Sequence, residues 1–148
     1  MKSGNVKAIS ISTKKGIPKT NVQSATLRQN WGIEGDVHAG EWHRQISLLS
    51  DESIDKIRTA GLPDVNAGDF AENITTENIE LMSLPIGSKL KLGKDIILEI
   101  TQIGKECHTK CAIYQTVGDC VMPREGIFAK VIQGGNLYVD DTIECMEL

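Results

Sequence analysis

Residues 85–104, PIGSKLKLGKDIILEITQIG, decide the fold class. The runs at 89–92 and 96–102 are short and rich in Leu and Ile, with polar residues interleaved as in half-buried strands. Gly93, Lys94 and Asp95 lie between the two runs and have the composition of a tight turn. The stretch therefore predicts two strands joined by a turn.

Strands of the same kind are predicted on both sides of this pair. VKAISIS at 6–12 alternates apolar and polar residues, and RQISLLS at 44–50 has the apolar run of a buried strand. A polar loop runs into a short strand within 66–81, an apolar element covers 127–132, and a final strand covers 142–146, with a turn at Gly134-Gly135 before it.

One helix is predicted within residues 50–63, SDESIDKIRTAGLP. Ser50 is a suitable N-cap, and Ile54, Ile57 and Ala60 have the spacing of a buried helix face. Gly61 ends the pattern, and a proline follows two residues later. Many short strands with glycine turns and one or two helices predict a mainly β barrel with helical decoration, in a single domain over residues 1–148.

Composition excludes several classes of function. A net charge of −4 and an isoelectric point of about 5.4 do not suit a nucleic-acid-binding protein, which needs a basic face. No apolar run is long enough to span a membrane, and the N-terminus resembles no secretory signal, so we expect a cytoplasmic protein. Its four cysteines would then be reduced, and metal binding or thiolate chemistry competes with simple burial.

Two polar glycine-containing segments are candidate binding loops. GIEGDVHAG at 32–40 presents Asp36 and His38, which would point to the same side of an extended backbone. It is equally typical of a hairpin turn with a solvated histidine. GDFAENIT at 68–75 presents Asp69, Glu72 and Asn73, residue types that commonly bond their own backbone in turns.

The cysteine-rich segment GKECHTKC at 104–111 allows three interpretations. Cys107, His108, Cys111 and the later Cys120 provide four zinc-type ligands, although their spacing is unusual for a structural zinc site. The second interpretation is a reactive thiolate at Cys107, favoured by a nearby lysine and His108. The third is that the cysteines are small buried side chains. Burial is the expectation for Cys145, which lies in the last predicted strand.

The order of these motifs resembles the MOSC domain family, the domains related to the C-terminal part of molybdenum cofactor sulfurases. The segments are GIEGDVHAG, RQISLLS, GDFAENIT, LPIGSKLKLG, GKECHTKC and MPREGIFAKVIQGG, and the chain looks like the small stand-alone bacterial type. The resemblance implies a distorted closed β-barrel with a few short helices, similar to the pyruvate-kinase barrel. GGNLYVDD at 134–141 departs from the glycine-aspartate turn usual in the family.

The resemblance also implies a site. Its characteristic cysteine corresponds to Cys107, with Cys111 as the rival and His108 beside both, and Cys107 would carry sulfur or ligate molybdenum. Cofactor-binding positions are expected at Gly35, Asp36, His38, Gly40, Arg44, Glu72, Asn73 and Arg124. The chain lacks the pyridoxal-phosphate desulfurase domain of a full sulfurase, so no pyridoxal phosphate is expected on this chain alone.

The leading hypothesis is therefore a protein that handles the molybdenum cofactor (molybdopterin), with a sulfurtransferase-type activity if the thiolate carries a persulfide. Expected partners are a sulfur-donor protein and molybdenum cofactor biosynthesis proteins or molybdoenzymes, with no nucleic acid and no membrane. The alternatives are a non-catalytic module that binds or delivers the pterin cofactor, and a zinc-stabilised scaffold.

Overall fold

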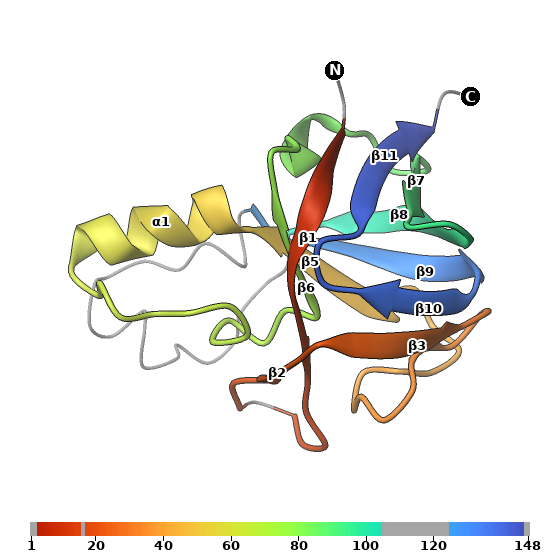
Figure 1. Cartoon of the computed structure of the whole chain (residues 1–148), viewed down its shortest axis with the longest axis horizontal. Helices are drawn as coiled ribbons and strands as arrows, with labels where there is room; N and C mark the ends of the chain where they lie inside the picture. Colours follow the sequence, from red (N-terminus) through yellow and green to blue (C-terminus); the bar gives the residue numbers. More distant parts are fainter. Residues whose placement is uncertain (1–2, 16, 105–124, 147–148) are drawn as a thin grey trace.

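The structure, a computed structural model, describes residues 3–15, 17–104 and 125–146. Within these ranges the chain is mainly β, and its α-helix lies to one side of the strands (Figure 1). The elements, in chain order, are β1 (Ser3–Ile11), β2 (Thr20–Val22), β3 (Ser24–Arg28), β4 (Gly32–Ile33), β5 (Ile46–Ser50), α1 (Asp51–Ala60), β6 (Ile74–Glu77), the 3₁₀ turn η1 (Leu81–Ser83), β7 (Lys89–Leu92), β8 (Ile96–Ile103), β9 (Ile127–Gln133), β10 (Gly135–Tyr138) and β11 (Thr142–Met146).

Seven strands close into a barrel in the order β11-β7-β8-β9-β5-β6-β1. The barrel closes where β1 pairs with β11, with Gly4 opposite Ile143. All neighbours in this order are antiparallel except β5 and β6, which run parallel because α1 and the following loop carry the chain back between them. The predicted closed barrel is confirmed, and β7 and β8 are the two strands of the sequence stretch 85–104.

A second, three-stranded sheet has the order β10-β3-β4. It corrects the turn predicted at Gly134-Gly135, because Gly135 is the first residue of β10 and pairs with Leu27 of β3. A Cβ at Gly134 would collide with the carbonyl oxygen of Leu27. Gly134 therefore lets the chain pass close to β3. Strand β10 was not predicted from the sequence.

Helix α1 begins and ends as predicted. The Ser50 hydroxyl accepts a hydrogen bond from the Ser53 N–H, and Gly61, at φ 137°, follows the last helical residue. Ile54 and Ile57 are buried on the outer side of the barrel with Leu49, Phe70 and Phe128. Ala60, predicted on the same face, is exposed.

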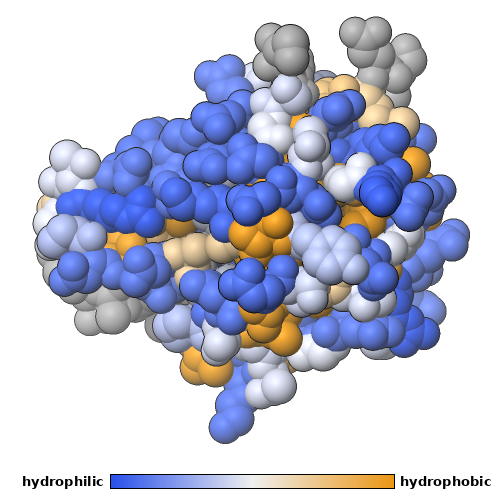
Figure 2. Space-filling view, viewed as in Figure 1, coloured by the Kyte–Doolittle hydropathy of each residue, from blue (hydrophilic) through white to orange (hydrophobic). Residues whose placement is uncertain are grey.

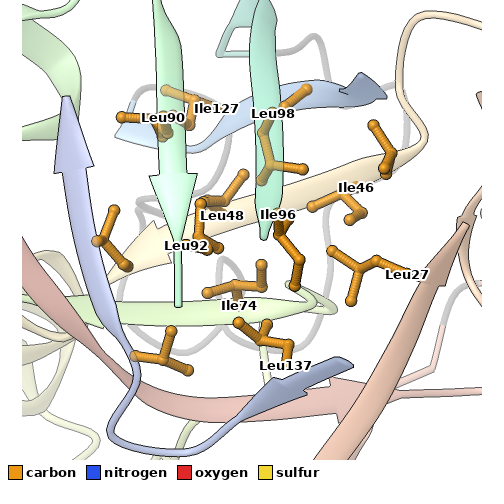
Figure 3. Packing of buried hydrophobic residues seen from close by; sticks show 14 of the residues in the cluster. Leu27, Ile46, Leu48, Ile74, Leu90, Leu92, Ile96, Leu98, Ile127 and Leu137 are labelled. Atoms are coloured by element: carbon orange, nitrogen blue, oxygen red, sulfur yellow. The ribbon is translucent and has the colours of Figure 1, made fainter. Parts of the chain in front are cut away.

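The barrel interior is filled by aliphatic side chains that converge from strands around it, as Leu48, Leu92 and Ile127 do in Figure 3. Among the described residues, the main buried cluster consists of Ile, Leu and Val with one Ala and contains no aromatic residue, as suits a chain with 4% aromatic residues. Close aliphatic packing makes the barrel a rigid support for the loops at its ends.

The face shown in Figure 2 is mostly hydrophilic, with small apolar spots separated by polar residues. Such scattered apolar residues are normal on a protein surface. None of the helices among the described residues has the length and hydropathy needed to cross a membrane.

Candidate functional site

The glycine-rich loop after β4 brings Asp36 and His38 together by turns rather than by an extended strand. The Asp36 N–H donates to the Ile33 carbonyl, and the Ala39 N–H donates to the Asp36 carbonyl. Gly35 adopts φ +85°, and a Cβ at this position would meet no atom within 4 Å. The loop thus combines a backbone that favours glycine with open space beside it.

The side chain of Lys19, which no sequence motif singled out, contacts both Asp36 and His38 of this loop. The Lys19 ammonium is 2.7 Å from Asp36 Oδ1, 3.0 Å from His38 Nδ1 and 3.1 Å from Ser12 Oγ. The Lys19 and Asp36 side chains are fully buried, whereas 29% of the His38 side chain is exposed. His38 is therefore the outermost member of the cluster.

The Asp36 carboxylate is held by several donors. Burial by itself raises the pKa of Asp36, but hydrogen bonds from Lys19, the Ser12 N–H and Asn73, with the charge of Lys19, bring the pKa below its ordinary value. The second oxygen, Oδ2, accepts the backbone N–H of His38 at 3.1 Å. Asp36 is thus ionised and links Ser12, the residue after β1, with Lys19 and the glycine loop.

The segment GDFAENIT lies behind this cluster. Asn73 is fully buried and bonds strands on both sides, with its Nδ2 donating to the Ser10 carbonyl and its Oδ1 accepting the Ser47 N–H. Glu72 Oε2 accepts from the Gly68 N–H and the Thr75 hydroxyl. Gly68 in turn accepts the Lys19 N–H at its carbonyl, so Glu72 supports the lysine through the backbone.

Burial strongly affects Glu72. It raises the pKa of the carboxyl above the ordinary value, and the donors Gly68 and Thr75 offset this only in part. The second carboxyl oxygen, Oε1, has no hydrogen-bond partner among the described residues. Asp69 instead accepts the N–H of Asn66 at 2.8 Å, which is the local turn role allowed by the sequence.

Arg44 lies at the other end of the loop. Its guanidinium carbon is 4.7 Å from the centre of the Trp42 ring and 5.4 Å from that of Phe128. Trp42 Nε1 donates to the His38 carbonyl at 2.8 Å, and a Cβ at Gly40 would lie 3.7 Å from the Trp42 ring. Trp42 therefore connects His38 with Arg44, and Arg44 Nε is buried without a hydrogen-bond partner in the described part of the chain.

The residues that follow this loop lie beside the two described segments on either side of residues 105–124. The Gly104 N–H donates to the Gly126 carbonyl at 2.7 Å, so the ends of these segments are adjacent. The Thr101 hydroxyl bonds the carbonyls of His43 and Phe128, and His43 Nε2 lies 2.9 Å from Gln102 Oε1. Residues 42–44 thus pack beside the ends of β8 and β9.

The family follows from a comparison of the whole chain with known families. The model of the MOSC domain matches residues 34–144, three quarters of the chain. The chain belongs to the MOSC domain family. The matched range includes the glycine loop from Glu34 onward, Arg44, Glu72 and Asn73, whereas Lys19 lies before it.

Solved structures support the same barrel. The YuaD protein of Bacillus subtilis has a TM-score of 0.81 at 20% identity, over 97% of this MOSC domain and 95% of that chain. YiiM of Geobacillus stearothermophilus has a TM-score of 0.74 at 18% identity, over 97% of this chain and 75% of that one. These likenesses show the fold.

A curated relative is a protein of Gibberella moniliformis named "Reductase". It is 26% identical over 157 residues, which cover 90% of this chain. The MOSC chain spans only 28% of the length of that relative.

The remaining predicted residues of this MOSC domain lie outside the described residues. They are Cys107, His108, Cys111, Cys120 and Arg124. Cys145, predicted to be buried, is only partly buried, although it packs against the barrel core. No metal-binding group of three or more His, Cys, Asp or Glu residues occurs within 3–15, 17–104 and 125–146.

Sequence reasoning missed Lys19, Trp42 and Gly68 as parts of the site. Lys19 stands in the turn KKGIPKT with Lys14 and Lys15, which are both exposed, and no local pattern distinguishes it from them. Gly68 begins the motif GDFAENIT, and its φ of +93° is the kind of backbone requirement that a glycine in a polar loop can signal.

Proposed function

We propose that this MOSC domain binds the molybdenum cofactor, with Cys107 as the thiolate that carries sulfur or ligates molybdenum. The family membership supports a role connected with this cofactor. The observation that carries the proposal is the position of the residues that directly follow the glycine loop. Arg44 packs on Phe128, and its neighbour His43 bonds residues at the end of β8. The cysteine segment starts at that same edge.

Sequence distance favours Cys107 over Cys111 for this role. Cys107 follows Gly104 by three residues, which span at most about 11 Å of extended chain, whereas Cys111 follows it by seven residues. Gly104 is fixed by its hydrogen bond to Gly126. Only three residues of chain after Gly104 would therefore be needed for Cys107 to meet a group bound beside residues 42–44.

The described residues suit an anionic, oxygen-rich group. Arg44 has a buried Nε without a partner among the described residues, and a guanidinium binds phosphate oxygens through two parallel hydrogen bonds. The negative charge of Asp36 is compensated by Lys19, so this carboxylate would repel a bound anion only weakly. Arg44 and His38, joined through Trp42, would hold the cofactor, and Arg124 would add a further cation.

When bound, the cofactor would supply molybdenum, for which a soft thiolate is a suitable ligand. In the sulfur-carrier role, the Cys107 thiolate would attack the outer sulfur of a persulfide on a donor protein. A new S–S bond would form at Cys107 as the donor S–S bond breaks, and the donor would leave as a thiolate. This exchange needs no external oxidant or reductant, and a molybdoenzyme would be the natural recipient.

The test compares Cys107→Ser with Cys111→Ser as the matched control. Each full-length protein is produced in a host that makes the cofactor, and bound molybdenum, pterin and protein persulfide are measured. Loss of molybdenum or persulfide in Cys107→Ser, with both retained in Cys111→Ser, is the expected result. Equal molybdenum and unchanged sulfur transfer in Cys107→Ser would overturn the assignment of this cysteine.

The same preparations distinguish the alternative functions. A non-catalytic binding module would keep its cofactor when Cys107, Cys111 and Cys120 are all replaced by serine. A zinc-stabilised scaffold would contain about one zinc per chain and would unfold on chelation. Either outcome would replace the proposed role of the thiolate.

A further inference from the structure

The buried ammonium of Lys19 has three polar atoms within hydrogen-bond distance. They are Asp36 Oδ1 at 2.7 Å, Ser12 Oγ at 3.1 Å and His38 Nδ1 at 3.0 Å. An ammonium group has three donors and no acceptor. The three contacts therefore use its full hydrogen-bonding capacity.

The charges of the cluster follow from burial and from the remaining contacts. Asp36 is fully buried, and without a charged Lys19 its carboxylate would be an uncompensated buried charge. Ser12 donates its own hydroxyl hydrogen to the Lys14 carbonyl at 3.1 Å, so its oxygen faces Lys19 as an acceptor. The contacts of Asp36 and Ser12 are thus those expected beside a protonated Lys19, which has only hydrogen-bond donors.

A donor at this position determines the protonation of the His38 ring. Nδ1 lies 3.0 Å from Lys19 Nζ, and it can accept a hydrogen bond only if it carries no hydrogen itself. Asp36 does not accept a hydrogen from Nδ1, because Oδ2 lies 3.8 Å from Nδ1, beyond hydrogen-bond distance, and accepts the backbone N–H of His38 instead.

We propose that Lys19 is a positioning residue that fixes His38 in the tautomer with its hydrogen on Nε2. Nε2 is then the hydrogen-bond donor of the ring, and any partner of Nε2 must supply an acceptor, such as the oxygen of a phosphate, an oxo group or a carbonyl. In the opposite tautomer, with the hydrogen on Nδ1, Nε2 would be a hydrogen-bond acceptor. This inference rests on the proposed function only in taking His38 as part of the binding site, and it holds for the protein without cofactor.

The backbone supports this placement of Lys19. The Lys19 N–H donates to the Gly68 carbonyl at 2.8 Å, and the Gly68 N–H donates to Glu72 Oε2 at 3.0 Å. A Cβ at Gly68 would lie 2.5 Å from the Lys19 carbonyl oxygen. Glu72 and Gly68 thus help to hold Lys19 in the position from which it contacts His38.

The test is nitrogen-15 NMR of the histidine rings in the cofactor-free full chain. The chain has three histidines, so His38→Gln assigns the His38 signals by their loss. Spectra are recorded at about pH 8, above the ordinary titration range of histidine. Wild type is expected to show a pyridine-type Nδ1 and a pyrrole-type Nε2.

Lys19→Met keeps a long side chain but removes the donors, and it is expected to shift His38 toward the tautomer with a hydrogen on Nδ1, facing Asp36. Lys14→Met, in the same turn and exposed, is the control and is expected to leave the His38 signals unchanged. A hydrogen on Nδ1 in wild type would overturn the proposal, even if Lys19→Met failed to fold.

An unchanged His38 tautomer in folded Lys19→Met would also overturn it. The measurement uses no cofactor, so failure of molybdenum binding and failure of this tautomer assignment are separate results.

Discussion

At the scale of single residues, the site depends on charged groups placed where the core would otherwise be apolar. Lys19 and Asp36 are fully buried and 2.7 Å apart, and each compensates the charge of the other. Removing one partner of such a pair leaves an unpaired buried charge, which is far more costly than losing an ion pair at the surface.

The Lys19–Asp36 pair gives a stability prediction. Lys19→Met and Asp36→Asn are each expected to lower the free energy of unfolding by about 3–5 kcal/mol, and the double variant by much less than the sum. Urea denaturation measures these values. The exposed pair Arg28–Glu34, 3.7 Å apart, is the control, and Arg28→Met is expected to cost below about 1 kcal/mol. Additive effects of the two buried substitutions would contradict the coupling.

Glu72 gives a pH prediction of defined sign. Because burial raises its pKa in the folded state, the native protein binds a proton that the unfolded chain has already released. The wild type therefore loses stability relative to Glu72→Gln as the pH rises from about 4.3 through the raised pKa. Glu144→Gln, at an exposed position on β11, should show no such trend. A pH-independent difference between wild type and Glu72→Gln would show that the buried carboxyl does not titrate as described.

At the scale of elements, loops hold the site and strands fix the loops. Gly68 and Gly87 both have positive φ, at 93° and 95°, but they differ in their surroundings. A Cβ at Gly68 would be 2.5 Å from the Lys19 carbonyl oxygen, whereas a Cβ at Gly87 would meet no atom within 4 Å. A comparison of alanine substitutions at the two positions therefore separates the cost of backbone strain from the cost of steric contact.

Alanine substitutions at these glycines test this difference. Gly87→Ala is expected to cost about 1–2 kcal/mol from backbone strain alone. Gly68→Ala should cost clearly more, because its methyl group would displace the Lys19 carbonyl and disturb the Lys19 N–H bond to Gly68. Thermal unfolding of both variants measures the difference. Equal costs would mean that the Gly68 loop moves without affecting Lys19.

At the scale of the whole molecule, local signals predicted the barrel well. The alternation in 89–92, the apolar run of β5 and the Ser50 cap are properties of adjacent residues, and the structure confirms each of them. Strand β10 was missed because its pairing with β3 joins residues more than 100 positions apart, and because the pair Gly134-Gly135 at its start resembles a turn.

The site was predictable only where it follows a motif. Asp36 and His38 were identified from their glycine loop, but their common partner Lys19 comes from a turn before β2 and is buried only by the fold. Glu72 and Asn73 were expected to bind the cofactor, and the structure places them in the buried layer behind the loop. Burial depends on long-range packing, which no local pattern contains.

The measurement that tests the central claim most directly is the molybdenum content of the purified wild-type chain after production with the cofactor. Binding through the glycine loop and Cys107 predicts molybdenum and pterin in equimolar amounts with the protein, and loss of both in the double variant Arg44→Gln/Cys107→Ser. Molybdenum no higher than in an unrelated protein purified in parallel would contradict the account.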